Sequence, residues 1–219
     1  YNNLGNVFKV QKNLQQALVC YEKAIKLNPN YSEAYNNLGN VFFENQQIER
    51  AILFCKKAIL LNPNYSEAYF SIGNIFKNQK QIDDAMYCYN QAISINPNYI
   101  EAIMNLANCF FEIGKYEDAI TNFQKLIRIN PNIPESFLNI GLIMIGEGKL
   151  ESSITYLEKS LKLNPKLSLA HFNLGNIYKE LDNYETAIKY YNLAIHVSPK
   201  YVNAYINKAL IYKNLDDFD

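Results

Sequence analysis

Asparagine recurs at two positions of this chain with a spacing that could hold a peptide by hydrogen bonding. The first position holds Asn3, Asn37, Ser71, Asn105, Asn139, Asn173 and Asn207, and the second, three residues later, holds Asn6, Asn40, Asn74, Asn108, Leu142, Asn176 and Leu210. These 14 positions contain 11 asparagines, although a random distribution of the chain's 31 asparagines over 219 residues would place only about two there. An amide side chain both donates and accepts hydrogen bonds, as a peptide backbone does. We call this set the asparagine ladder.

Two interpretations of the asparagine ladder stay open at this point. Residues three and four apart lie on one face of a helix, so Glu33, Asn37, Asn40 and Glu44 form one polar stripe. The amides either hold the backbone of an extended ligand along this stripe or hydrogen-bond the neighbouring helices. Asparagine lowers helix stability slightly, so repeated placement inside helices indicates one of these two roles.

An apolar series precedes the asparagine ladder by one residue. This position holds Asn2, Asn36, Phe70, Met104, Leu138, Phe172 and Ile206, with Phe43, Phe111 and Ile145 on the same flank. Rows of exposed apolar side chains mark interaction sites. Phe70, Met104, Leu138 and Phe172 are therefore candidates for contacting apolar side chains of a ligand, and the alternative is packing against the adjacent unit.

The elements that carry these positions recur every 34 residues. Six of the seven prolines share this spacing: Pro29, Pro63, Pro97, Pro131, Pro165 and Pro199. In residues 32–65, apolar side chains follow helical spacing twice, first at Ala34, Tyr35, Leu38, Gly39 and Phe42, then at Ile48, Ala51, Ile52, Cys55, Ala58 and Ile59. Ser32 is the expected N-cap of the first helix, and Pro63 ends the second. Each unit is thus predicted to be two helices joined by a short turn.

A stacked all-α array is the predicted fold class, because one helix pair cannot cover both of its apolar faces. The expected units are 1–31, 32–65, 66–99, 100–133, 134–167 and 168–201, with a partial unit at 202–219, in a single array over residues 1–219. The chain lacks an initiating Met and begins inside a helix, so we expect a fragment of a longer protein.

The unit at residues 134–167 departs most from the pattern. It begins with the additional Pro134 and contains Gly146 and Gly148, each of which would cost roughly 1 kcal/mol inside a helix. The glycines before Gly114 are expected to pack helices closely.

The pattern resembles the tetratricopeptide repeat over the whole chain. The matching residues of one unit are Tyr35, Leu38, Gly39, Phe42, Ala51, Cys55, Ala58 and Pro63, and those of the next are Tyr69, Ile72, Gly73, Phe76, Ala85, Tyr89, Ala92 and Pro97. This resemblance implies a right-handed α–α superhelix of about six and a half repeats, with the asparagine ladder in its concave groove. It further implies a scaffold that binds an extended peptide segment of a partner protein.

An alternative function comes from the motif Asn-Leu-Gly-Asn at residues 3–6, 37–40 and 173–176. This motif resembles the repeat region of O-linked N-acetylglucosamine transferases. That resemblance implies a substrate-recognition arm whose catalytic domain lies outside this sequence.

Charge and motif content argue against several other partners. Lys plus Arg and Asp plus Glu both number 21, so no basic footprint for nucleic acid is expected. No apolar run is long enough for a membrane span. Chaperone adaptors of this family clamp a carboxylate with lysines, but one of those positions here holds Glu33, Glu67, Glu101, Glu135, Leu169 and Asn203. We therefore expect no chaperone-tail ligand. The sequence leaves the oligomeric state undetermined.

No catalytic residue, metal site or cofactor is predicted, so this segment is not expected to be an enzyme. His171 lies in an aromatic packing position, and neither His171 nor His196 has a companion at metal-ligand spacing. The cysteines Cys20, Cys55, Cys88 and Cys109 fall on apolar helix faces, which favours a reducing compartment, cytoplasmic or nuclear.

Overall fold

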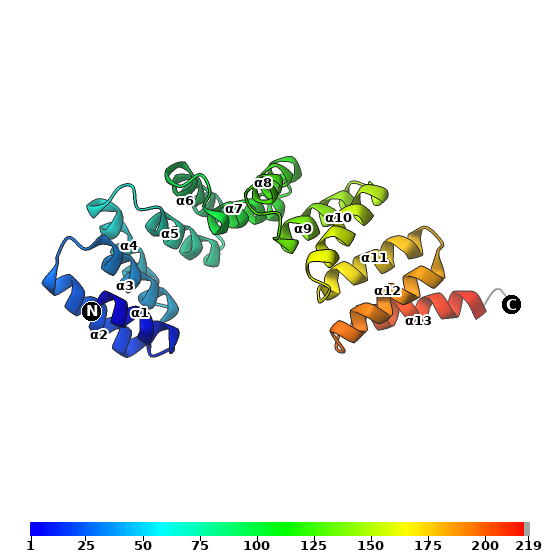
Figure 1. Ribbon diagram of the computed structural model, residues 1–219, viewed down its shortest axis with the longest axis horizontal. Coiled ribbons are helices and arrows are strands. Elements are labelled where there is room, and N and C mark those ends of the chain that lie inside the picture. The colour runs from blue at the N-terminus through cyan, green and yellow to red at the C-terminus, as the bar shows by residue number, and fades with distance from the viewer. Residues whose placement is uncertain (217–219) are drawn as a thin grey trace. The chain divides into compact units, whose positions relative to one another are not determined.

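The computed structural model describes the backbone of residues 1–216 and the side chains of residues 1–213, and all of its regular structure is helical (Figure 1). The helices in this range are α1 (Asn2–Val10), α2 (Leu14–Leu27), α3 (Ser32–Glu44), α4 (Ile48–Leu61), α5 (Ser66–Asn78), α6 (Ile82–Ile95), α7 (Ile100–Glu112), α8 (Tyr116–Ile129), α9 (Pro134–Gly146), α10 (Leu150–Leu163), α11 (Ser168–Glu180), α12 (Tyr184–Val197) and α13 (Val202–Asp216). The predicted all-α array of helix pairs is confirmed. None of these helices is both long and apolar enough to cross a bilayer.

The first helices of successive pairs begin where the sequence predicted each unit to begin. From the second unit on, these starts are Ser32, Ser66, Ile100, Pro134, Ser168 and Val202. Pro134 takes the first turn of α9, where its missing N–H has no helical partner to lose. The expectation that Ser32 is an N-cap is wrong by one residue. Tyr31 occupies that position without a side-chain cap, and Ser32 is already helical.

An Asn-Pro sequence turns the chain from one pair to the next. The Oδ1 atom of Asn28 accepts a hydrogen bond from the backbone N–H of Asn30 at 3.1 Å, and Asn62 bonds Asn64 in the same way. Asn28 itself is extended, with φ −135° and ψ 92°, as expected before proline. The asparagine side chain thus closes a turn around the proline.

The turn inside each pair requires one residue in the left-handed region, again at a 34-residue spacing. The residues with positive φ there are Lys12, Gln46, Lys80, Gly114, Gly148 and Asp182. Gly148 therefore lies in a turn and not inside a helix as the sequence suggested, and Gly146 is the last residue of α9. Glycine removes strain at this position, whereas Gln46 adopts φ +60° despite its Cβ.

Two compact units make up the chain, Tyr1–Gly114 with α1 to α7 and Lys115–Asp219 with α8 to α13. Within each unit, every helix packs against the helices that precede and follow it in that unit. The core of the first unit includes Tyr21, Leu38 and Phe42. That of the second includes Leu174 and Tyr191. All four cysteines are free and buried, as their apolar positions predicted.

Replacing Gln46 with glycine should stabilise the chain by about 0.5–1 kcal/mol, because the left-handed conformation no longer strains a Cβ. Guanidinium denaturation followed by circular dichroism measures the free energy of unfolding. The control is Asn45→Gly at the adjacent residue, whose φ of −83° brings no such relief. Equal destabilisation by both substitutions would contradict the strain argument.

Candidate functional site

A buried tyrosine hydroxyl joins adjacent repeats in the first unit. The ring of Tyr89 on α6 lies against Gly73 on α5 so closely that a Cβ on Gly73 would meet Tyr89 Cε1 at 2.6 Å. The Tyr89 hydroxyl donates to Asn74 Oδ1 at 2.9 Å, and Asn105 Nδ2 on α7 donates to the same oxygen at 2.8 Å. Asn105 also reaches the tyrosine hydroxyl at 3.4 Å. We call this group of glycine, tyrosine and two asparagines the tyrosine lock.

The tyrosine lock occurs three times among the described residues. In α1 to α3, Tyr21 donates to Asn6 Oδ1 at 2.8 Å and Asn37 Nδ2 donates to that oxygen at 3.2 Å. In the second unit, Tyr191 and Asn207 both donate to Asn176 Oδ1 at 2.8 Å. Glycine, tyrosine and second asparagine are separated by 16 residues at each step.

Six members of the asparagine ladder therefore bond neighbouring helices, which was one of the two interpretations left open by the sequence. The other members differ in their surroundings. Asn173 donates to the carbonyl of Leu169 in its own helix at 2.8 Å, and Asn3 is exposed. Asn108 and Asn139 are half-buried and also interact with other residues.

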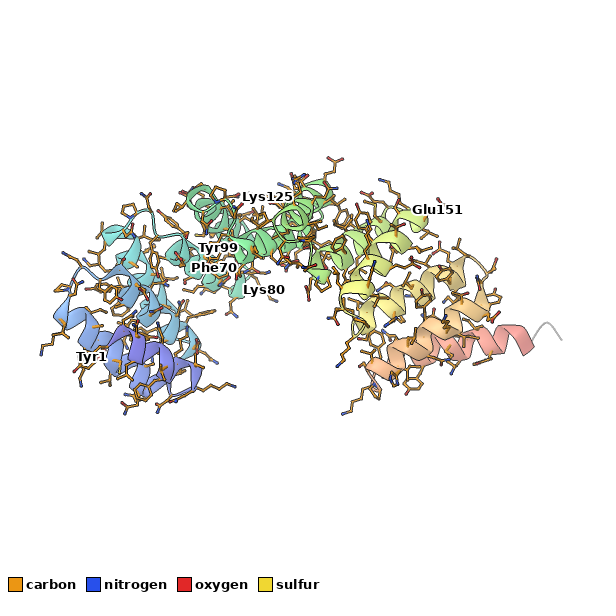
Figure 2. The ribbon with its side chains drawn as sticks, in the orientation of Figure 1. Tyr1, Phe70, Lys80, Tyr99, Lys125 and Glu151 are labelled. Carbon is orange, nitrogen blue, oxygen red and sulfur yellow. The ribbon has the colours of Figure 1, made fainter. Side chains whose placement is uncertain are left out.

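The apolar series packs largely on neighbouring residues, the alternative that the sequence analysis allowed. Figure 2 labels Phe70 and Tyr99, whose ring centroids lie 5.1 Å apart, and Phe172 lies at the same distance from Tyr201. Leu138 belongs to a core cluster with 8% of its surface exposed, and Met104 is half-buried. Phe70 alone of these four also borders the hollow described below.

The tyrosine lock is interrupted between the second and third repeats. Cys55 occupies the tyrosine position beneath Gly39, where an added Cβ would meet its Sγ at 2.6 Å, and Ser71 replaces the second asparagine. The thiol reaches only Asn36 Oδ1, at 3.7 Å. Asn40 thus lacks both usual partners, and it forms no hydrogen bond within the described part of the chain.

A hollow of about 390 Å³ lies at this interruption, between α1, α3 and α5. Its polar lining consists of Asn36, Asn37, Asn40, Ser71 and Asn74, its aromatic lining of Phe43, Tyr65, Phe70 and Tyr99, and its charged lining of Lys9, Glu44 and Glu67. We call this feature the α3–α5 hollow. It combines amides with ring surfaces, as small recognition sites do.

Charges at the α3–α5 hollow are unequal. Lys9 pairs with Glu44 at 3.3 Å, whereas Glu67 receives a hydrogen bond from the Ser66 hydroxyl at 2.9 Å and has no cation partner among the described residues. Burial raises the pKa of Tyr99 to about 12, and the negative charges of Glu67 and Glu101 add to the shift. Burial and then Glu67 and Glu33 likewise raise the pKa of Tyr65. Both phenols therefore stay protonated at neutral pH.

The residues described here form no cluster of three or more His, Cys, Asp or Glu side chains that could hold a metal. His171 is 7% exposed and lies against Tyr190, with ring centroids 6.2 Å apart. Its Nε2 is 3.0 Å from the carbonyl oxygen of Pro165. This placement matches the packing role expected from the sequence.

Tyr89→Phe should lower the free energy of unfolding by about 1 kcal/mol, because the lock loses the hydroxyl but keeps the ring. Tyr87→Phe is the matched control, since Tyr87 lies on the same helix with 65% of its surface exposed. Denaturation curves of both variants provide the comparison. Equal stability of the two variants would show that the shared hydroxyl contributes nothing.

Alkaline pH should destabilise the first unit through Tyr21. Burial raises the pKa of Tyr21 to about 12 from 10.0, with smaller effects from Glu44, Cys20 and Glu33. The unfolded tyrosine ionises first, so this contribution is complete below pH 10 and is lost as pH rises from about 10 to about 12. Melting temperatures between pH 8 and 11.5 should fall less steeply for Tyr21→Phe than for Tyr87→Phe. Parallel curves would contradict this account.

Comparison with known proteins places the chain among helical repeat proteins. Models described as TPR repeat match residues 5–46 and 107–146, and models described as tetratricopeptide repeat match residues 32–65, 66–99, 88–121, 134–167 and 168–201. No curated protein sequence matches the chain significantly. The comparisons therefore lend no support to the transferase resemblance.

Solved structures show the same fold. PilF of Pseudomonas aeruginosa has a TM-score of 0.82 at 19% identity, covering 98% of this chain and 96% of its own. YrrB, described as a TPR protein with an unusual peptide-binding site, has a TM-score of 0.71 at 23% identity, covering 86% and 97%. MamA has a TM-score of 0.67 at 26% identity, covering 76% and 97%. The repeat matches run without a gap from residue 5 to residue 201, and the chain belongs to the tetratricopeptide repeat family.

Proposed function

We propose that this chain is a protein-interaction scaffold and that its α3–α5 hollow binds an extended segment of a partner protein. Proteins with the TPR fold typically mediate protein–protein interactions, which supports the general class. YrrB, whose description names a peptide-binding site, shares this fold at low identity. In this proposal the scaffold acts by binding, without chemistry of its own.

The observation that carries the proposal is the amide of Asn40 beside the α3–α5 hollow. In the complete locks, the equivalent oxygens of Asn6, Asn74 and Asn176 each accept two hydrogen bonds. Asn40 has a donor and an acceptor without protein partners, and it borders a space large enough for a ligand. A peptide backbone offers both complementary groups.

This proposal assigns different roles to different members of the asparagine ladder. Asn6, Asn37, Asn74, Asn105, Asn176 and Asn207 are already committed to bonds between helices. Removing one of them would disturb the packing of two repeats. Asn40 is the ladder member whose loss should change binding without changing the fold.

Asn40→Ala should weaken peptide binding at least about tenfold, equivalent to about 1.4 kcal/mol, while leaving the melting temperature unchanged or slightly raised. The probe is a set of 12-residue peptides selected on the wild-type chain from a random displayed library. Fluorescence anisotropy measures their affinity. Asn45→Ala is the control, because Asn45 is exposed at the end of α3 and does not line the hollow.

A second variant, Ser71→Asn, tests the same site from the opposite direction. The introduced amide reproduces the donor that Asn37 and Asn105 supply in complete locks, so it should occupy Asn40 and compete with the ligand. Binding should fall while stability is maintained or increased. Selected peptides that bind both variants as well as the wild type would refute the hollow as the binding site.

A further inference from the structure

Resting on the proposed function, we infer that the segment bound in the α3–α5 hollow carries a lysine or arginine side chain beside Glu67 and the rings of Tyr65 and Tyr99. The hollow thus selects a basic peptide, not an acidic or purely apolar one. The argument uses the charge, the rings and the hydrogen bonds of the hollow.

The first step is the unbalanced charge of Glu67. Lys9, the cation that lines the hollow, is engaged by Glu44 at 3.3 Å, which leaves Glu67 as the uncompensated charge of the lining. Glu33 and Glu101 occupy the equivalent helix starts on either side and add negative potential at Tyr65 and Tyr99, respectively. Complementary charge guides the choice of a partner and speeds its encounter.

The second step is the aromatic lining next to this carboxylate. Tyr65, Phe70 and Tyr99 border the same hollow, and the rings of Phe70 and Tyr99 lie 5.1 Å apart at 42° (Figure 2). Ring faces attract cations and also cover the methylene groups of a lysine or arginine stem. A carboxylate beside such rings favours a cationic side chain over a neutral one.

The third step is a comparison with the equivalent glutamate of the preceding repeat. Glu33 accepts a hydrogen bond from Asn2 Nδ2 at 2.7 Å and a longer one from the Tyr31 hydroxyl at 3.4 Å. Glu67 receives only the hydroxyl of its neighbour Ser66 among the described residues. The amide of Asn36, which corresponds to Asn2, instead accepts the Cys55 thiol and bonds Tyr65. Glu67 consequently retains acceptor capacity that faces the hollow.

The test compares peptide selection on the wild-type chain with selection on Glu67→Gln, using a random library of displayed 12-residue peptides. Selection on the wild type should enrich Lys and Arg, and the affinity of the selected peptides should fall as NaCl rises from 50 to 500 mM. Glu67→Gln should remove the enrichment and reduce affinity for the basic peptides at least about fivefold. Glu49→Gln is the matched control, because Glu49 also lies in the first turn of a helix but outside the hollow.

Each outcome distinguishes the two proposals. Peptides that depend on Asn40 but show no basic bias, or an acidic one, would overturn the inference about charge and leave the hollow as a binding site. Basic peptides that respond equally to Glu67→Gln and Glu49→Gln would also overturn it, because only general charge would be involved. Selection that yields no peptide dependent on Asn40 would overturn the proposed function, and this inference with it.

Discussion

A tyrosine hydroxyl buried between two asparagines is the interaction on which the packing of this array depends. Its oxygen-accepting asparagine lies on the first helix of a pair, the tyrosine on the second, and the second asparagine on the following pair. No single pair contains all of these groups. The bond is therefore a property of the stack, and it adds directional contacts to an otherwise non-directional apolar core. The glycine beneath the ring is needed because any side chain there would displace the tyrosine.

Sequence periodicity predicted the helices well because it arises from local constraints. Pro63 forces an extended residue before it, and this constraint placed the end of α4 at Leu61. The left-handed turn was harder to predict, since Lys12 and Gln46 carry it as well as Gly114 and Gly148. There the geometry is imposed by the packing of the pair, and the residue type only modulates its strain.

The asparagine ladder was recognisable in the sequence, but the roles of its members were not. A hydrogen bond from Asn105 to Asn74 joins residues 31 positions apart, and helical periodicity within one unit contains no information about it. One signal was available: Tyr21, Tyr89 and Tyr191 each accompany asparagine at both associated ladder positions. The α3–α5 hollow was less predictable still. It arises where Cys55 and Ser71 stand in place of larger side chains, and a missing group leaves no motif.

Cys55 gives the interrupted lock a further consequence. Burial raises the pKa of its thiol to about 12, a shift that nearby Lys9 only partly opposes, so the reactive thiolate is scarce at neutral pH. An alkylating reagent can reach the sulfur only when the second helix pair separates transiently. The rate of its covalent capture would then report how often this junction breathes, and an occupant of the neighbouring cavity would slow that clock without touching the sulfur.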